Sequence, residues 1–139
     1  GPELFARTAC VLLPKDWLRF MLSGARASDM SDASGTLWLD VGARDWSDGL
    51  LASCGLTRRQ MPELVEGSAV AGHLAAGPAA RWGVPAGIPI AGGAGDNAAS
   101  AVGMGLVGAG QGFVSLGTSG VIFVSGERFA PDAGWQLLR

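Results

Sequence analysis

Two glycine-rich segments carry the residues that could do chemistry in this chain. The first, residues 92–97 (GGAGDN), follows an apolar run typical of a strand and places the carboxylate of Asp96 where a helix is expected to begin. The second, residues 115–120 (SLGTSG), sets hydroxyl groups and glycines on a turn between two apolar runs. Glycines let another molecule approach the backbone, and the N–H groups of such turns bind phosphate oxygens. An acid together with a phosphate-binding turn indicates phosphoryl transfer to a hydroxyl, because that reaction needs positioning, charge neutralisation and one proton acceptor.

A simple helix cap is the alternative interpretation of Asp96, and the local residues leave it open. Capping alone does not explain the glycines that precede the acid. A helix N-terminus also favours the ionised form of a carboxylate, which makes it a weak base. Phosphoryl transfer tolerates a weak base, since the proton leaves late in a loose transition state. Residues 93–98 also resemble a dinucleotide-binding GxGxxA pattern, but the acid would repel the pyrophosphate.

The second segment has a plain hairpin turn as its alternative interpretation. It is not a Walker loop, because the sequence contains no GK[ST]. It is not a GxSxG nucleophile elbow either, because Val121 stands where that pattern requires its second glycine, and His73 is the only histidine of the sequence. The functional hypothesis is that backbone N–H groups of the turn and the hydroxyl of Thr118 bind phosphate.

Metal binding is not expected for this sequence. Residues 29–36 superficially resemble a calcium loop, but Ser34 occupies the position that requires glycine and Ala33 cannot act as a ligand. Helix capping explains that segment better. Cys10 and Cys54 have no CxxC spacing and no second histidine, so we expect buried, reduced thiols in a cytoplasmic protein.

The composition fits one ordinary domain with a buried core: 139 residues, 48% hydrophobic, with a mean hydropathy of +0.31. Only 16% of residues are charged, against about 25% in typical soluble domains, so part of the surface is expected to face other protein. A net charge of −2 with scattered basic residues argues against nucleic acid as a partner. The uncharged run of residues 82–95 is full of glycine and proline and is too short for a membrane span. Without a leader or an initial Met, the chain is expected to begin inside a longer sequence or after processing.

Apolar spacing predicts the elements that position the two segments. Helices are expected over residues 15–22, 32–39, 48–54, 78–82 and 98–104, and strands over residues 70–74, 88–91, 113–116 and 121–124. Ser31 and Ser47 are the expected N-caps of the second and third helices. Strand 88–91 should be buried, and the last two strands should form a hairpin. A domain boundary is expected near residues 108–112, because the composition changes there from a helical to a strand pattern. A lone hairpin is marginal in water, so the last 30 residues would open a second domain.

Four motifs in this order resemble the FGGY family of carbohydrate kinases. They are residues 13–16 (LPKD), 31–36 (SDASGT), 95–99 (GDNAA) and 115–120 (SLGTSG). Together they span most of the chain, and their order and intervals are far more specific than any single motif. Within the family they look most like the members that phosphorylate xylulose.

The resemblance implies an α/β chain with a partial ribonuclease H-like, actin-like ATPase fold. Residues 1–107 would be the later part of the first, sugar-binding domain. Residues 108–139 would be the truncated start of the second, nucleotide-binding domain, beginning with its opening hairpin. The rest of the kinase, including the magnesium and adenosine contacts, would lie outside this sequence, so the piece alone should be inactive.

The resemblance also implies the roles of individual residues. Asp96 matches the catalytic base, which accepts the proton of the attacking sugar hydroxyl, and both Asp96 and its neighbour Asn97 would contact the sugar. Gly117 and Thr118 match the turn that touches the phosphates of the co-substrate MgATP. The expected reaction converts a ketopentose, D-xylulose, to D-xylulose 5-phosphate in the cytoplasm, by a protein that could form a homodimer.

A non-catalytic module is the alternative function. In that interpretation an actin-like half-domain persists as a binding or assembly element. The low charge and the unpaired edge of the hairpin, which could recruit another chain, support it.

Overall fold

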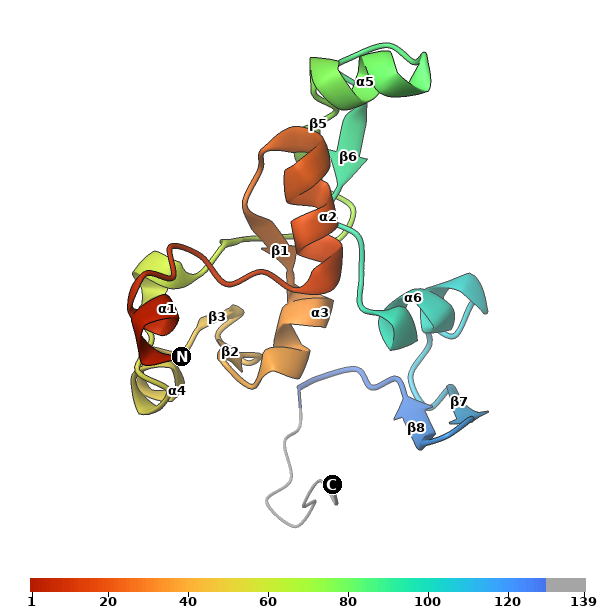
Figure 1. Ribbon diagram of the computed structural model, residues 1–139. Coiled ribbons are helices and arrows are strands. Elements are labelled where there is room, and N and C mark those ends of the chain that lie inside the picture. The colour runs from red at the N-terminus through yellow and green to blue at the C-terminus, as the bar shows by residue number, and fades with distance from the viewer. Residues whose placement is uncertain (130–139) are drawn as a thin grey trace. The chain divides into compact units, whose positions relative to one another are not determined.

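The computed structural model of the chain describes residues 1–129 and has two compact units, which divide between Asp96 and Asn97 (Figure 1). Its helices are α1 (Pro2–Ala6), α2 (Pro14–Ser23), α3 (Met30–Ala33), α4 (Asp48–Ser53), α5 (Ala76–Trp82) and α6 (Asp96–Gly103), with 3-10 turns η1 (Ser34–Thr36) and η2 (Arg58–Gln60). The described strands pair two by two. Parallel β1 (Ala27–Asp29) and β4 (Glu63–Val65) form one pair; β2 (Leu39–Asp40) with β3 (Asp45–Trp46), β5 (Val70–His73) with β6 (Pro89–Ala91), and β7 (Gly112–Leu116) with β8 (Gly120–Val124) are antiparallel.

Local sequence signals set most helix ends. Pro14 occupies the first turn of α2, where its missing N–H costs nothing, and Gly24 ends that helix in the left-handed conformation with φ 76°. The hydroxyl of Ser47 accepts a hydrogen bond from the Leu50 N–H at the start of α4. Gly83 ends α5 in the same way as Gly24 ends α2. These helix predictions are confirmed.

The predicted helix over residues 32–39 is wrong. Asp29, not Ser31, is the N-cap of α3, and its Oδ2 accepts hydrogen bonds from the N–H groups of Ser31 (3.0 Å) and Asp32 (3.2 Å). The helix stops at Ala33, because the hydroxyl of Thr36 bonds the Ala33 carbonyl at 2.7 Å and a 3-10 turn replaces the next α-helical turn. Leu39, the last residue of the predicted helix, belongs instead to strand β2.

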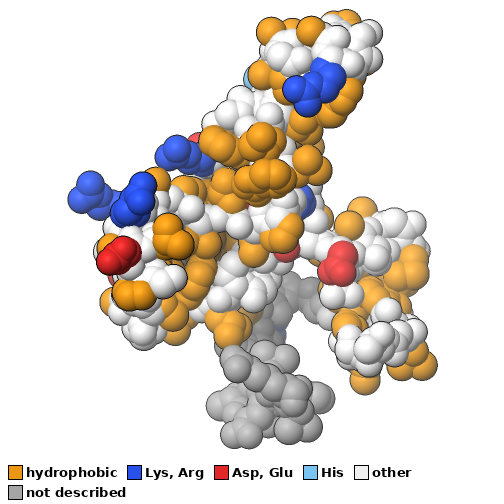
Figure 2. Space-filling model, in the orientation of Figure 1, with side chains coloured by type: hydrophobic (Ala, Val, Ile, Leu, Met, Phe, Trp, Pro, Cys, Tyr) orange, Lys and Arg blue, Asp and Glu red, His pale blue; other side chains and the backbone are white. Residues whose placement is uncertain are grey.

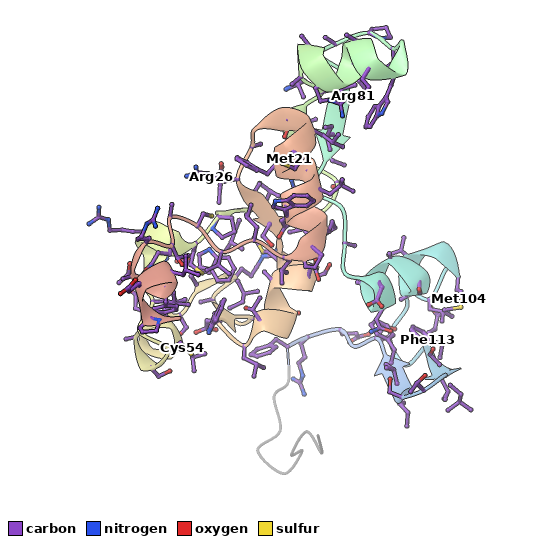
Figure 3. The ribbon with its side chains drawn as sticks, in the orientation of Figure 1. Met21, Arg26, Cys54, Arg81, Met104 and Phe113 are labelled. Carbon is purple, nitrogen blue, oxygen red and sulfur yellow. The ribbon has the colours of Figure 1, made fainter. Side chains whose placement is uncertain are left out.

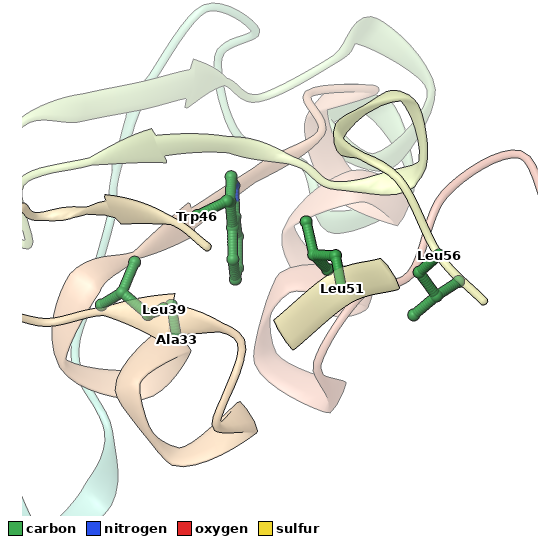
Figure 4. Close-up of a cluster of buried hydrophobic side chains, with 5 residues drawn as sticks. All are labelled: Ala33, Leu39, Trp46, Leu51 and Leu56. Atoms are coloured by element: carbon green, nitrogen blue, oxygen red, sulfur yellow. The ribbon is translucent and has the colours of Figure 1, made fainter. Parts of the chain in front are cut away.

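A small apolar core lies within the first unit. Its buried members are Ala33, Leu39, Trp46, Leu51 and Leu56 (Figure 4). They come from α3, β2, β3, α4 and the turn after α4, so the core joins elements spread over 24 residues. The indole N–H of Trp46 donates to the carbonyl of Pro62 at 3.0 Å, which satisfies its one polar atom inside the core.

Two predictions of burial are also wrong. Strand β6 was expected inside a sheet, but Pro89 and Ala91 are exposed, because β5 is its sole strand partner among the described residues. The thiol of Cys54 was expected to be buried, but Cys54 is exposed just after α4, where its Sγ accepts a hydrogen bond from the indole of Trp38 at 3.4 Å. Both cysteines are free, as expected.

The second unit contains the predicted hairpin, and the structure confirms it. Strands β7 and β8 run in register from the pair Gly112 and Val124 to the pair Leu116 and Gly120. The rings of Phe113 and Phe123 stack with centroids 5.2 Å apart, and Figure 3 labels Phe113 on this hairpin. The face of the hairpin opposite the two rings is exposed to solvent, since Leu116 on that face is 85% exposed.

Apolar side chains reach the surface of the first unit as well. Trp17, Leu18 and Met21 on α2 are each more than half exposed, and Figure 2 shows hydrophobic side chains over much of the face in view. This pattern matches the low charge of the sequence. Within residues 1–129, no helix has the length and hydropathy needed to cross a membrane.

Candidate active site around the glycine loop

The glycine loop, residues 92–95, connects strand β6 to the start of helix α6 at Asp96. Its first half lies against the turn at residues 66–69. The N–H of Gly92 donates to the Ala69 carbonyl, and the N–H of Gly93 donates to the Gly67 carbonyl, both at 2.9 Å. A Cβ on Gly92 would lie 2.5 Å from the carbonyl oxygen of Glu66, so the two backbones approach as closely as glycine alone permits.

Substitution of Gly67 by alanine is expected to disturb this contact. The added Cβ would lie 2.5 Å from the carbonyl oxygen of Gly93, which is backbone and must move. We expect Gly67→Ala to lower the free energy of unfolding of the whole protein by about 1–3 kcal/mol, as other overpacked sites do. Urea unfolding followed by tryptophan fluorescence would measure the change.

Gly49→Ala is the matched control for that variant. Gly49 lies in α4, and its Cβ would meet nothing within 4 Å. This variant should be neutral or slightly stabilising, because alanine loses less backbone entropy than glycine. Equal stability of the two variants would show that the loop has room to relax.

Two cations of α2 hold the carbonyl groups that lead into the loop. Arg19 donates from Nη1 to the Gly92 carbonyl oxygen at 2.6 Å and to that of Ala91 at 3.5 Å. Lys15 donates from Nζ to the same Gly92 oxygen at 3.2 Å. Lys15 and Arg19 lie four residues apart on α2, so they project from one helix face. The β6 end of the glycine loop is therefore fixed by charge-assisted hydrogen bonds.

A buried ion network supports these cations. The carboxylate of Asp16, which is completely buried, accepts from Arg19 Nη2 at 2.6 Å and from Lys15 Nζ at 2.7 Å. Arg19 also donates to the Ala27 carbonyl oxygen at the start of β1. Lys15 Nζ lies 2.8 Å from Oδ1 of the buried Asp29. The network thus joins α2 to β1 and to the loop.

The network shifts the pKa values of its members in different directions. Burial lowers the pKa of Lys15, but the contacts with the Asp16 and Asp29 carboxylates outweigh it and hold that pKa above its usual value. Burial likewise raises the pKa of Asp29, but Lys15, the Ser31 hydroxyl and the Asp32 N–H outweigh it and bring the pKa below its usual value. For Asp32, burial dominates and raises the pKa. Lys15 and Asp29 therefore form a fully charged pair near neutral pH.

Three carboxylates gather closely enough to resemble a metal site. One oxygen from each of Asp16, Asp29 and Asp32 lies within 4.8 Å of the others. The ammonium group of Lys15 contacts all three, at 2.7, 2.8 and 3.7 Å. The lysine therefore supplies the positive charge that this group of carboxylates requires.

The other end of the loop is tied to the start of α3. The N–H of Gly95 donates to the hydroxyl oxygen of Ser31 at 3.0 Å. A Cβ on Gly95 would lie 3.4 Å from the Asp32 Cα, so the loop is in van der Waals contact with this turn of helix. Each end of the glycine loop is therefore held by a different element.

The predicted site residues fall at two places. Asp96 and Asn97 are the first two residues of α6, directly after the glycine loop. Gly117 and Thr118 lie on the turn between β7 and β8 in the second unit, where the Gly117 N–H donates to the Ser119 carbonyl at 2.9 Å. Each pair is brought together on one short segment, as the motifs predict.

Sequence reasoning missed the residues that hold the loop. Lys15 and Asp16 lie within one of the four motifs, but the contact of Lys15 with the loop spans 77 residues of sequence, and Asp16 acts only through Lys15 and Arg19. The available signal was the helical spacing of Asp16 and Arg19, which is typical of paired side chains but does not predict their burial. Ser31 was predicted as a cap, and its bond to Gly95 was not foreseen.

Comparison with known proteins identifies the family. Residues 1–103 match the N-terminal domain of the FGGY family of carbohydrate kinases. This chain belongs to that family, so the predicted resemblance is confirmed.

The particular relatives are xylulose kinases. The xylulose kinase of Escherichia coli (strain K12) is 56% identical over 128 residues, which is 92% of this chain and 26% of the relative. The crystal structure of a xyloylose kinase from Brucella ovis aligns with a TM-score of 0.88 and 58% identity over 94% of this chain and 27% of that one. A xylulose kinase from Rhodospirillum rubrum aligns with a TM-score of 0.86 and 28% identity, over 96% of this chain and 27% of that one. This chain spans about a quarter of the length of these relatives.

Proposed function

We propose that the whole protein to which this chain belongs is an ATP-dependent kinase that converts D-xylulose to D-xylulose 5-phosphate. The observation that carries the proposal is the glycine loop, which is fixed at both ends and leads directly into Asp96. The 56% identity to a xylulose kinase supports the choice of sugar. The non-catalytic alternative has no support in the comparisons.

Asp96 is the proposed catalytic base. Its carboxylate accepts the proton of the sugar hydroxyl as the hydroxyl oxygen forms a bond to the γ-phosphorus and the bond from that phosphorus to the bridging oxygen of ADP breaks. Asn97 supplies an amide that can both donate to and accept from sugar hydroxyls. The fixed loop keeps these two side chains in place before the sugar binds, which reduces the entropy lost in reaching the transition state.

The turn between β7 and β8 is the proposed contact for the phosphates of MgATP, the co-substrate. Gly117 has no side chain to obstruct a phosphate, and a Cβ there would meet only the Ser119 carbonyl oxygen at 3.8 Å. Thr118 offers a hydroxyl that can donate to a phosphate oxygen. A charge-assisted hydrogen bond of this kind neutralises part of the charge that the transition state spreads over the phosphoryl oxygens.

The domain organisation that we propose is an actin-like ATPase fold of the ribonuclease H type, represented here in part. Residues 1–107 belong to the later part of the sugar-binding domain, and residues 108–139 open the nucleotide-binding domain. The match to the family's N-terminal domain ends at residue 103, close to this boundary, which supports it. We also propose a cytoplasmic location, where ATP is available, and a possible homodimer.

The test of the proposed function is release of ADP by the whole protein. D-Xylulose should stimulate ADP release far more than ribulose, gluconate or glycerol. The matched control is 5-deoxy-D-xylulose, which retains the rest of the sugar but lacks the hydroxyl that receives the phosphate. ADP release that is independent of the added sugar would contradict the proposal.

Substitution of Thr118 by valine is expected to weaken the use of ATP. The change deletes the phosphate-facing hydroxyl and keeps the shape of the side chain. Loss of a hydrogen bond to a charged group costs about 1.5–3 kcal/mol, so kcat/KM for ATP should fall by about 10- to 100-fold, with little change in the KM for sugar. Initial rates with ATP varied at saturating sugar would measure it.

Thr118→Ser is the control, because it keeps the hydroxyl and should retain most activity. If Thr118→Val changed the KM for sugar alone, the assignment of the turn to phosphate would be wrong.

A further inference from the structure

We propose that Ser31 is a positioning residue for Asp96, acting through the backbone of the glycine loop; this inference rests on the proposed role of Asp96 as the base. Ser31 belongs to α3, 64 residues before Gly95 in the sequence. Its hydroxyl oxygen accepts a hydrogen bond from the Gly95 N–H at 3.0 Å. Gly95 directly precedes Asp96, so this bond fixes the peptide from which the base extends.

The direction of each hydrogen bond at Ser31 follows from the chemistry of its partners. The hydroxyl has one proton, and it donates that proton to Oδ2 of Asp29 at 2.5 Å. An ionised carboxylate can only accept, and the N–H of Gly95 can only donate. The hydroxyl must therefore point its proton at Asp29 and its lone pair at Gly95. A chain of two hydrogen bonds thus runs from the loop to the carboxylate of Asp29.

The carboxylate of Asp29, at the far end of these two hydrogen bonds, is held in a fixed position. It is buried, and its Oδ2 also accepts from the N–H groups of Ser31 and Asp32, while its Oδ1 pairs with Lys15 at 2.8 Å. These contacts keep the carboxylate ionised and in one orientation. The orientation of the Ser31 hydroxyl is then fixed as well, because the acceptor of its proton does not move.

The Ser31 hydroxyl ties down the backbone at the Asp96 end of the glycine loop. Gly95 has no side chain that could hold its position, and a Cβ there would be in ordinary contact with Asp32 rather than in a clash. The cations of α2 act on the carbonyl of Gly92, at the opposite end of the loop. Loss of the Ser31 oxygen should therefore loosen the end next to the base and leave the other end attached.

The test is a double-mutant cycle in the whole protein with Ser31→Ala and Asp96→Asn. Ser31→Ala should lower kcat by about tenfold, the usual effect of one lost hydrogen bond, and change the KM for xylulose less than threefold. In the Asp96→Asn background the same change should lower the residual kcat less than twofold, because there is no base left to position. A role in folding alone would not produce this dependence on Asp96.

Three further variants complete the design. Ser31→Thr keeps the hydroxyl, and its extra methyl group has room because Ser31 is exposed, so it should restore at least half of the wild-type kcat. Ser31→Cys keeps the volume but offers only a weak donor and acceptor, so it should behave like Ser31→Ala and serves if the alanine variant does not fold. Ser53→Ala removes a comparable hydroxyl bond to the Leu50 carbonyl in α4 and should leave kcat unchanged.

The outcomes separate the two proposals. Wild-type kcat in both Ser31→Ala and Ser31→Cys, or an equal loss with and without Asp96, would overturn the role of Ser31 while the kcat of Asp96→Asn remained low. High activity of Asp96→Asn itself would instead overturn the base.

Discussion

Asp96→Asn in the whole protein should lower kcat by about two to four orders of magnitude, the range typical of the loss of a general base. The substitution keeps the size and polarity of the side chain at the start of α6, so the fold and the position of the group should persist. The amide cannot accept the proton of the attacking hydroxyl. The KM for xylulose should change little, since the hydrogen-bonding shape of the side chain is kept. Steady-state ADP release at saturating substrates measures the effect.

Asp40→Asn is the matched control. The carboxylate of Asp40 is exposed and accepts a hydrogen bond from the Ala43 N–H in the turn between β2 and β3, a role that an amide oxygen can also fill. The same chemical change at this position should leave kcat unaltered. If Asp96→Asn kept more than about a tenth of the wild-type kcat, Asp96 would not be the base.

Arg19→Met should destabilise the protein severely. Arg19 and Asp16 are both buried and paired at 2.6 Å, so removal of the guanidinium leaves a buried carboxylate whose one remaining cationic partner within residues 1–129 is Lys15. Breaking one side of a buried ion pair costs about 3–5 kcal/mol. The carbonyl oxygens of Ala27 and Gly92 lose a donor as well. The loss of unfolding free energy in urea, or failure to express in soluble form, would report the effect.

Two further variants serve as controls for Arg19→Met. Arg44→Met breaks an exposed ion pair with Glu66 and should cost less than about 1 kcal/mol. Arg19→Lys keeps the charge but not the planar group that reaches several oxygens at once, so its stability should lie between those of wild type and Arg19→Met. A cost below about 1 kcal/mol for Arg19→Met would show that the buried network does not hold the first unit together.

Local signals allowed most of the helices and the strands β5 to β8 to be predicted, whereas the short strands β1 to β4 were not predicted. Pro14 and Gly24 delimit α2, and Ser47 caps α4, because each acts within its own helical turn. The start of α3 was ambiguous, since both Asp29 and Ser31 are good capping residues and lie two positions apart. The structure uses Asp29 as the cap because β1 ends there in extended conformation. The hydroxyl of Ser31 is left available for the contact with Gly95.

The proposed catalytic and phosphate-binding residues could be predicted from the sequence, but the residues that hold the glycine loop in place could not. Asp96 and Thr118 stand beside glycines within short motifs, so a reader of the sequence finds them. Lys15 and Arg19 both donate to the backbone carbonyl of Gly92, which lies 77 residues from Lys15 and 73 residues from Arg19 in the sequence. Because every residue has a backbone carbonyl, the sequence does not indicate which one the two side chains bind. Burial of β6 failed as a prediction because it depends on neighbouring layers, which the apolar residues of a strand do not specify.

The most direct measurement of the central claim is the distance from the Asp96 carboxylate to the sugar in a crystal structure of the whole protein. The crystals would contain D-xylulose and a non-hydrolysable ATP analogue. We predict that a carboxylate oxygen of Asp96 lies about 2.6–3.2 Å from the hydroxyl oxygen of xylulose nearest the γ-phosphate, the range needed for proton transfer. The Gly95 to Ser31 bond should be present in the same structure. A different carboxylate within that distance of the hydroxyl, with Asp96 turned away from the sugar, would contradict the account.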